Sequence, residues 1–172
     1  MPCDMIVPAV GSPTPTFSLL PQKYREAILN GLYRHIIPPK VPNLAFAGFN
    51  HSFLHIPGVE IASLWLLAKW LGYLVMPPRD AMNASISRVH EWKAQHSLPD
   101  SGINFGVSSR YHQYFDLLLG DLRMRKYRKM PNVIAEIFGW YQPSDYTGLC
   151  EEFREMMASN GTQKWKCLDV DM

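Results

Sequence analysis

Two histidines, His51 and His55, stand four residues apart and are candidate acid/base or orienting groups. Imidazoles at this spacing can also bind a metal ion together. Both precede Pro57, however, and no third ligand lies nearby in the sequence. We therefore expect a loop that lines a small-molecule cavity, and we expect no metal site.

The elements around these histidines read as one strand-loop-helix unit over residues 43–76. We predict a buried strand at 44–47, a turn at Gly48, a polar loop, and a long apolar helix opened by Pro57 and Gly58. In α/β proteins, ligands bind where the carboxyl end of a strand leads into a helix N-terminus, because free backbone N–H groups and the helix dipole favour electron-rich atoms. This unit is therefore the predicted ligand site.

The 172-residue length and the 47% apolar composition fit one domain, or one and a fraction, with a real hydrophobic core. The net charge of +2 indicates no special partner. Five cations lie within residues 123–129, where we expect them to complement the dipole at the end of a helix. No nucleic-acid-binding motif accompanies them, so we expect no nucleic-acid partner.

Three cysteines without CxxC spacing give neither a disulfide framework nor a zinc site, which favours a reducing, cytoplasmic setting. We read no signal peptide at the N-terminus. The apolar helix after Pro57 is interrupted by Glu60 and Lys69 within the length that a bilayer crossing needs. We therefore expect no membrane partner.

Beyond the central unit, the pattern predicts a short strand at 4–7 and a helix at 22–33 that stops near Gly31. Two strands cannot form a parallel sheet that is buried on both faces. We therefore expect an α/β fragment with few strands over residues 1–78, followed by a helix-rich C-terminal extension over 79–172. The extension should hold helices at 79–96, 108–122, 132–140 and 149–157, and a tail with little to hold it down.

Other polar residues have plainer interpretations. Ser109, His112 and Asp116 could form a hydrolytic triad, but no glycine turn surrounds the serine, so we do not expect one. Glu151 and Glu152 fit a solvated helix face. The five tryptophans fit core or interface positions better than a stacking platform.

The sequence contains no GxGxxG, P-loop, HExxH or GxSxG motif. Four longer segments nevertheless resemble the C-terminal third of class B flavin-dependent monooxygenases, the flavin-containing and Baeyer–Villiger types, and especially their fungal members. These segments are CDMIVPAVG at 3–11, GLYRHIIPPKVPNLAFAG at 31–48, IPGVEIASLWLLAKW at 56–70 and AEIFGWYQPSDYTGLCEEF at 135–153. Val10 stands where the family usually has threonine.

The resemblance implies an incomplete, Rossmann-like FAD-binding portion, FAD and NADPH as cofactors, and oxygenation of a small organic molecule such as a secondary metabolite. It places Gly48, Phe49 and Asn50 beside the isoalloxazine ring, and it gives Val59 and Glu60 first-turn N–H groups that can bond the flavin. The family's two glycine-rich dinucleotide loops and its NADPH domain are missing from this sequence, so most cofactor affinity should be lost.

Three functions follow from these observations. The first is a truncated flavin-dependent monooxygenase that is not competent alone. The second is flavin-independent small-molecule binding, or cyclase or isomerase activity, with Asn50, His51 or His55 as acid/base or orienting groups. The third is an interaction subunit that covers exposed apolar surface by forming a homodimer or by completing a partner flavoprotein.

Overall fold

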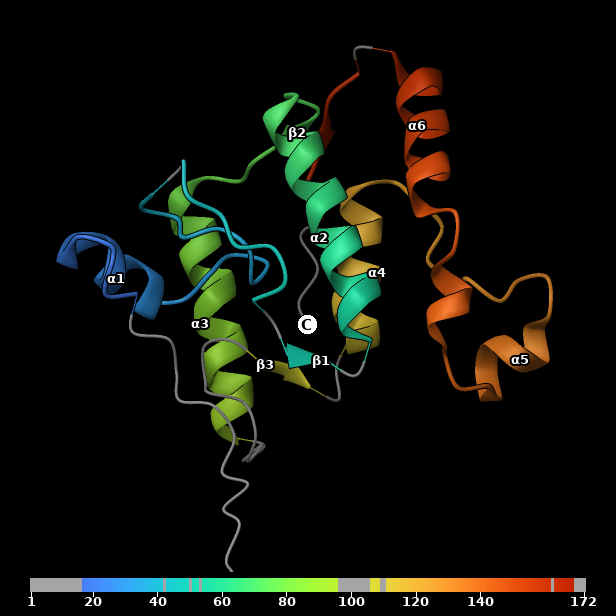
Figure 1. Ribbon diagram of the computed structural model, residues 1–172, viewed down its shortest axis with the longest axis horizontal. Coiled ribbons are helices and arrows are strands. Elements are labelled where there is room, and N and C mark those ends of the chain that lie inside the picture. The colour runs from blue at the N-terminus through green and yellow to red at the C-terminus, as the bar shows by residue number, and fades with distance from the viewer. Residues whose placement is uncertain are drawn as a thin grey trace, which may run out of the picture.

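A computed structural model describes residues 17–41, 43–49, 51–52, 54–95, 106–108, 111–161 and 163–168. These residues form six α-helices, one 3-10 helix and two pairs of very short parallel strands (Figure 1). The described chain is therefore a helix-rich α/β fragment. The predicted strand at 4–7 lies outside the described residues. Across the described ranges, no helix combines the length and the apolarity that a bilayer crossing requires.

Helix α2 (His55–Trp70) runs through the middle of the molecule (Figure 1). Its sequence is apolar on nearly all sides, so neighbours can cover it from several directions at once. Helices α4 (Tyr111–Asp121) and α6 (Leu149–Asn160) pack against it. The core that they share includes Trp65, Phe115 and Phe153. This core spans both sides of residue 78, and the domain boundary there stays a prediction.

The ends of α2 differ from the predicted ends for local reasons. The helix starts at His55, two residues before Pro57. It ends at Trp70, and Gly72 two residues later has φ +78°, which suits glycine. The amides of Gly72 and Tyr73 donate to carbonyls of the last turn at 3.1 and 2.9 Å. This left-handed glycine ending stops the helix before the predicted end at residue 76.

The strands are short and pair in parallel. Strand β1 (His51–Ser52) pairs with β3 (Gly106–Ser108), and β2 (Leu74–Val75) pairs with β4 (Trp165–Lys166). The prediction of a strand at 44–47 is wrong, because these residues have no regular secondary structure. Their apolar side chains are covered by packing instead: Leu44 and Phe46 contact a small cluster centred on Ile28 and Leu32.

The predicted helices are confirmed as α1 (Gln22–Leu29), α3 (Arg79–Gln95), α4, α5 (Val133–Phe138) and α6. A 3-10 helix, η1 (Pro143–Tyr146), precedes α6. Gly31 stops α1 close to the predicted position, with φ +112°. A Cβ at Gly31 would lie 2.5 Å from Cγ2 of Ile86 on α3. Glycine therefore allows the chain after α1 to approach α3 closely.

The prediction of a loosely held tail is wrong for residues 163–168. Trp165 is buried, and its ring stacks on Tyr73 with 5.5 Å between the ring centroids. Its amide donates to the Tyr73 carbonyl at 2.7 Å. The Leu168 amide donates to Oδ1 of Asp121 at 2.7 Å. Apolar and polar contacts together tie this segment to α4 and to the end of α2.

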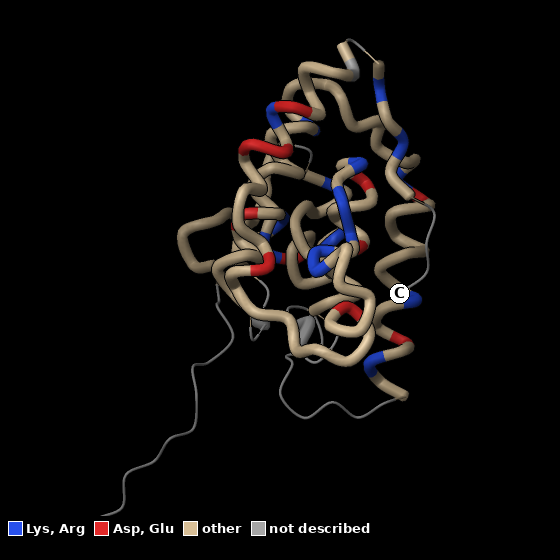
Figure 2. Tube along the Cα trace, turned by 90° about the vertical axis from the view of Figure 1, so that its right-hand side faces the viewer, with Lys and Arg blue, Asp and Glu red and all other residues tan. Residues whose placement is uncertain are grey.

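The basic segment 123–129 folds against α6. Nη1 of Arg128 lies 2.6 Å from Oε2 of Glu152, and the Arg128 side chain is only 2% exposed. The amide of Arg125 donates to Oε1 of the same carboxylate at 2.7 Å. The expected solvated position is therefore wrong for Glu152, whereas Glu151 is exposed as predicted. Arg128 pairs with a largely buried carboxylate of α6. Figure 2 shows basic and acidic positions interspersed along the traced chain.

Candidate functional site

The turn at Gly48 lies directly against the start of α2. Gly48 has φ +74°, in the left-handed region that favours glycine. A Cβ at this position would lie 2.6 Å from Cγ2 of Val59 and 3.7 Å from Cε1 of His55. The structure therefore brings three of the predicted site residues together, and only glycine fits at the first of them.

Among the described residues, no side chain caps the N-terminus of α2. Leu54 occupies the cap position with an apolar side chain that cannot accept a hydrogen bond, and the first turn carries no acid. Backbone amides at a helix start carry partial positive charge. Ile56 beside them is 80% exposed, whereas Pro57 and Gly58 are buried. The end of α2 next to Gly48 thus combines an electropositive backbone with exposed apolar surface.

Val59 and Glu60 lie beyond the first turn of α2, because the helix begins two residues earlier than predicted. Amides at such positions donate to carbonyls of the preceding turn, so their predicted first-turn place is wrong. Contact between these residues and a flavin stays a prediction. The Glu60 carboxylate faces α6, where Oε1 accepts a hydrogen bond from Sγ of Cys150 at 3.5 Å. Burial, and then this hydrogen bond, raise the pKa of the Cys150 thiol.

The Phe49 ring packs inside the protein. Its centroid lies 5.2 Å from that of Phe46 and 5.4 Å from that of Phe17. All three rings pack against the cluster of Ile28 and Leu32. Aromatic packing thus accounts for the position of Phe49 without a ligand, and its contact with an isoalloxazine ring stays a prediction.

The predicted histidine pair is only partly placed. His51 lies in β1, where its backbone pairs with Gly106, and its side chain is outside the described part of the structure. His55 is exposed at the first position of α2. Asn50 lies outside the described residues. Acid/base roles for these residues stay a prediction. Within the described ranges, no group of three or more His, Cys, Asp or Glu residues could hold a metal ion.

Two members of the triad weighed above lie on α4. His112 and Asp116 stand one turn apart there, and Ser109 lies outside the described residues. Burial raises the pKa of Asp116 to about 6, with Lys126 opposing the rise and Glu136 adding to it. Burial also lowers the pKa of His112. Glu136 of α5 affects the pKa of both His112 and Asp116, so the two groups lie near that helix.

Sequence reasoning missed a buried ion pair beside α2. Arg34 donates to both oxygens of Asp121, from Nε to Oδ2 at 3.0 Å and from Nη2 to Oδ1 at 3.2 Å. Nε1 of Trp65 donates to Oδ2 at 3.0 Å, and the Leu168 amide donates to Oδ1 at 2.7 Å. Burial raises the pKa of Asp121, and Arg34 is foremost among the groups that oppose this rise. The carboxylate is thus fully hydrogen-bonded, as a buried charge requires.

This pair joins the loop after α1 to α2, to the end of α4 and to the tail. Arg34 and His35 adopt left-handed backbone conformations, with φ of 56° and 54°. Such conformations cost about 1–3 kcal/mol each in residues other than glycine, so the surrounding contacts must offset them. A signal for the pair exists in the sequence: Arg34 and Asp121 each stand in an apolar run, LYRHII and LLLGDL, where a charge needs a partner.

Two hollows among the described residues lie away from the predicted site. An open hollow of about 320 Å³ lies beside α1 and is lined in part by Lys23, Tyr24 and Lys40. A second, of about 20 Å³, is lined in part by His35 and His90 and has room for about one water molecule. Neither includes Gly48 or His55.

Sequence comparison finds similar proteins among fungal enzymes. The chain is 32% identical over 127 residues to the FAD-dependent monooxygenase resA of Aspergillus sclerotiorum and 30% identical over 137 residues to the FAD-dependent monooxygenase rstn6 of Aspergillus nomiae. It is 27% identical over 132 residues to the FAD-dependent monooxygenase DEP4 of Alternaria brassicicola. No family model and no solved structure matches the chain.

These matches cover most of this chain but a small part of each relative. They span 71% of the chain and 22% of resA, 77% and 23% for rstn6, and 74% and 22% for DEP4. The chain therefore corresponds to between a fifth and a quarter of the length of these relatives. A match over 71% or more of 172 residues must include the middle of the chain, so α2 and the buried Trp65 fall within it.

Proposed function

The chain is a homologue of FAD-dependent monooxygenases, and from that premise we propose that it forms the part of such an enzyme that lies beside the flavin ring. In this proposal it is an incomplete, Rossmann-like portion of the FAD domain followed by a helical extension. The pyrophosphate sites for FAD and NADPH belong to the remaining length of the enzyme, because the glycine-rich loops that bind them are missing from this sequence.

The observation that carries this proposal is the contact between Gly48 and the open start of α2. A flat ring with hydrogen-bond-accepting oxygen and nitrogen atoms along its edge needs a close backbone approach, hydrogen-bond donors and apolar surface. Gly48 lets the turn lie directly against the start of α2, since any Cβ there would meet Val59 at 2.6 Å. The uncapped helix start supplies donors, and the exposed Ile56 supplies apolar surface. We therefore assign these residues to the ring end of FAD rather than to its phosphates, whose glycine-rich loop the sequence lacks.

FAD supplies the redox chemistry by which a monooxygenase transfers one oxygen atom from O₂ to its substrate, with NADPH as the proposed reductant. The residues of this chain would orient the ring and exclude water from one side of it. His55 is the described group best placed to hold a proton there, because it is exposed next to Gly48. The proposed substrate is a small organic metabolite. The isomerase alternative uses Asn50, His51 or His55 as acid/base or orienting groups, and it stays a prediction.

A segment exchange tests the proposal. We would replace the matching segment of the Aspergillus sclerotiorum enzyme resA with this chain, purify the product and measure its bound FAD and its NADPH-dependent O₂ consumption. The proposal predicts retained FAD, with an absorbance band near 450 nm that is typical of flavins. A soluble, folded exchange protein that holds no flavin, next to a parent enzyme that does, would reject it.

A further inference from the structure

Helix α5 presents an apolar surface to solvent. Val133, Ile134, Ile137 and Phe138 on the helix, with Trp140 just after it, form what we call the α5 patch. Their exposures run from 52% at Val133 to 86% at Trp140. The helix buries none of its own residues. A six-residue helix that gains nothing from burial is not stable by itself, so other contacts must hold α5 in place.

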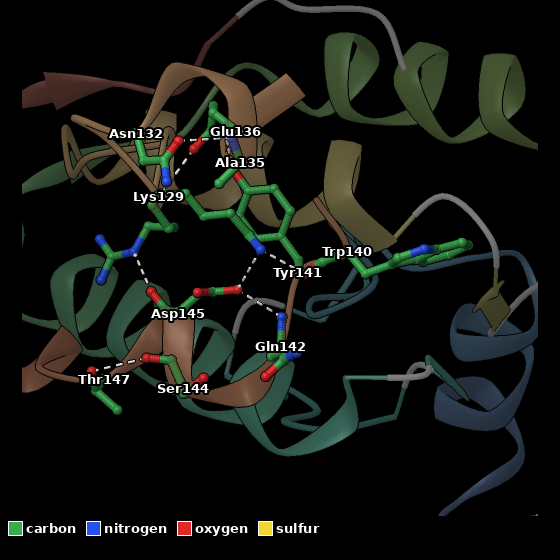
Figure 3. A network of polar contacts seen from close by, with 11 residues as sticks. Lys129, Asn132, Ala135, Glu136, Trp140, Tyr141, Gln142, Ser144, Asp145 and Thr147 are labelled. Atoms are coloured by element: carbon green, nitrogen blue, oxygen red, sulfur yellow. Dashed lines mark hydrogen bonds and ion pairs between the residues drawn. The ribbon is translucent and has the colours of Figure 1, made fainter. Parts of the chain in front are cut away.

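Those contacts are polar and lie on the other side of the segment. The Lys129 amide donates to Oε2 of Glu136 at 2.8 Å, and Nζ of Lys129 donates to the Trp140 carbonyl at 2.6 Å. Nζ of Lys129 also lies 3.4 Å from Oδ2 of Asp145. The Tyr141 hydroxyl donates to Oε1 of Glu136. Figure 3 shows these groups turned toward one another while the Trp140 ring points away from them.

Polar contacts also fix the start of α5 and the segment that follows it. Oδ1 of Asn132 accepts the Ala135 amide at 3.0 Å, which caps α5. The amide of Gln142 donates to Oδ2 of Asp145 at 2.7 Å. The polar network therefore holds α5 from one side and leaves its apolar side chains outward in a fixed arrangement. Preorganised apolar side chains of this kind are typical of a binding surface.

The size of the α5 patch distinguishes an interface from ordinary surface. A fully exposed Phe or Trp contributes roughly 150–250 Å², and monomers rarely expose contiguous apolar patches larger than a few hundred Å². Phe138 and Trp140, at 81% and 86% exposed, approach that limit by themselves, and three aliphatic side chains add to them. The α5 patch can thus form the apolar centre of a standard interface, which takes about 800 Å² from each partner.

We infer that the α5 patch is the docking surface for the rest of an FAD-dependent monooxygenase. This inference rests on the proposed function, and it identifies the remaining part of the enzyme as the partner that covers the α5 patch. The relatives carry more than three quarters of their length beyond the part that this chain matches, so their version of the fold has a large polypeptide to pack against it.

A second exposed apolar group favours this occupant over a second copy of the chain. Leu67, Trp70 and Leu71, near the end of α2, are 42%, 63% and 56% exposed. Helix α2 lies within the matched region, and its exposed end is separate from α5 in Figure 1. A two-fold dimer through the short α5 would leave the end of α2 in water. A partner of several hundred residues can cover both.

The test uses purified chain and, as partner, the resA polypeptide without its matching segment, after circular dichroism and size exclusion have shown that this partner is folded and soluble. Light scattering after size exclusion measures the mass of the mixture, and a titration measures the affinity. We expect a 1:1 complex that Phe138→Asp weakens at least tenfold. Leu19→Asp is the matched control, because Leu19 is 98% exposed on a different part of the chain and should leave the affinity unchanged. Ile134→Asp gives an independent second variant of the α5 patch.

The outcomes separate this inference from the proposed function. No complex with the unmodified chain, or a complex that neither α5 variant weakens, would overturn the docking surface. A dimer of the chain alone that Phe138→Asp dissolves would assign the patch to a second copy and also overturn it. Retained FAD in the complex reports on the proposed function separately. A Phe138-dependent complex that holds no FAD would leave the docking surface standing and contradict the flavin assignment.

Discussion

Trp65 on α2 donates its indole N–H to Oδ2 of Asp121 on α4 at 3.0 Å, and the same oxygen accepts from Nε of Arg34. A buried carboxylate is thus shared by two helices and a loop. The tail joins them, since Nη2 of Arg34 donates to the Leu168 carbonyl at 2.6 Å. This network sets the position of α2, and the start of α2 forms the candidate flavin site.

Removing the carboxylate should destabilise the protein strongly. Asp121→Asn leaves the Arg34 guanidinium buried without its counter-charge, which costs about 3–5 kcal/mol. Trp65→Phe removes one hydrogen bond to a charged group and costs about 1.5–3 kcal/mol. Chemical denaturation measures both. Asp80→Asn, at an exposed acid in the first turn of α3, is the control and should cost less than about 1 kcal/mol. Equal losses for Asp121→Asn and Asp80→Asn would contradict the network's role.

Asp116 should make the stability depend on pH. Its pKa is raised by burial to about 6 in the folded state, above its ordinary value of 3.8. The folded protein therefore binds the proton more tightly than the unfolded chain, and its stability should fall as the pH rises from about 4 to about 6. Lys126 and Glu136 face the same carboxyl with opposite effects.

Asp116→Asn isolates this effect, because the amide resembles the protonated acid. We expect the variant to match the parent near pH 4 and to exceed it at pH 7 by about 1–2 kcal/mol, after allowance for partial solvent screening. Urea denaturation at several pH values gives both curves. Parallel curves for the parent and the variant from pH 4 to pH 7 would show that Asp116 is not the group responsible.

Two Arg–Glu pairs that involve α6 should differ in their contribution to stability. Nη1 of Arg128 lies 2.6 Å from Oε2 of Glu152, with both side chains largely buried. Nη1 of Arg154 lies 3.7 Å from Oε1 of Glu151, with both side chains mostly exposed. Arg128→Met should cost about 2–4 kcal/mol, because it leaves a carboxylate short of partners.

Arg154→Met is the matched control and should cost at most about 0.5 kcal/mol. Thermal and chemical denaturation of the two variants give the comparison. If Arg128→Met proved as harmless as Arg154→Met, the pair of Arg128 and Glu152 would contribute no more than an exposed surface pair.

Helical periodicity was enough to predict the helices from α1 to α6, because their apolar spacing is regular. It failed at residues 44–47, where an apolar run packs on Ile28 and Leu32 without pairing as a strand. It also failed for Arg128, Glu152 and Trp165, whose partners are distant in the sequence.

The candidate site was predicted in part for the same reason. Gly48 beside the start of α2 follows from local turn and helix signals, and the structure confirms that the two are adjacent. The pairing of Arg34 with Asp121 spans 87 residues and could be suspected only from charges placed in apolar runs. The outward orientation of α5 depends on which side of the helix the polar network occupies, and periodicity does not reveal that.

The most direct measurement compares two glycine variants in the segment-exchange enzyme. Gly48 and Gly148 have nearly the same φ, +74° and +77°, in the left-handed region that alanine rarely adopts, so each substitution adds backbone strain. Only at Gly48 does the new Cβ meet another atom closely, whereas nothing lies within 4 Å at Gly148. We predict that Gly48→Ala loses most of its bound FAD while Gly148→Ala retains it, with both proteins soluble. Equal flavin content in the two variants would contradict a flavin site at the start of α2.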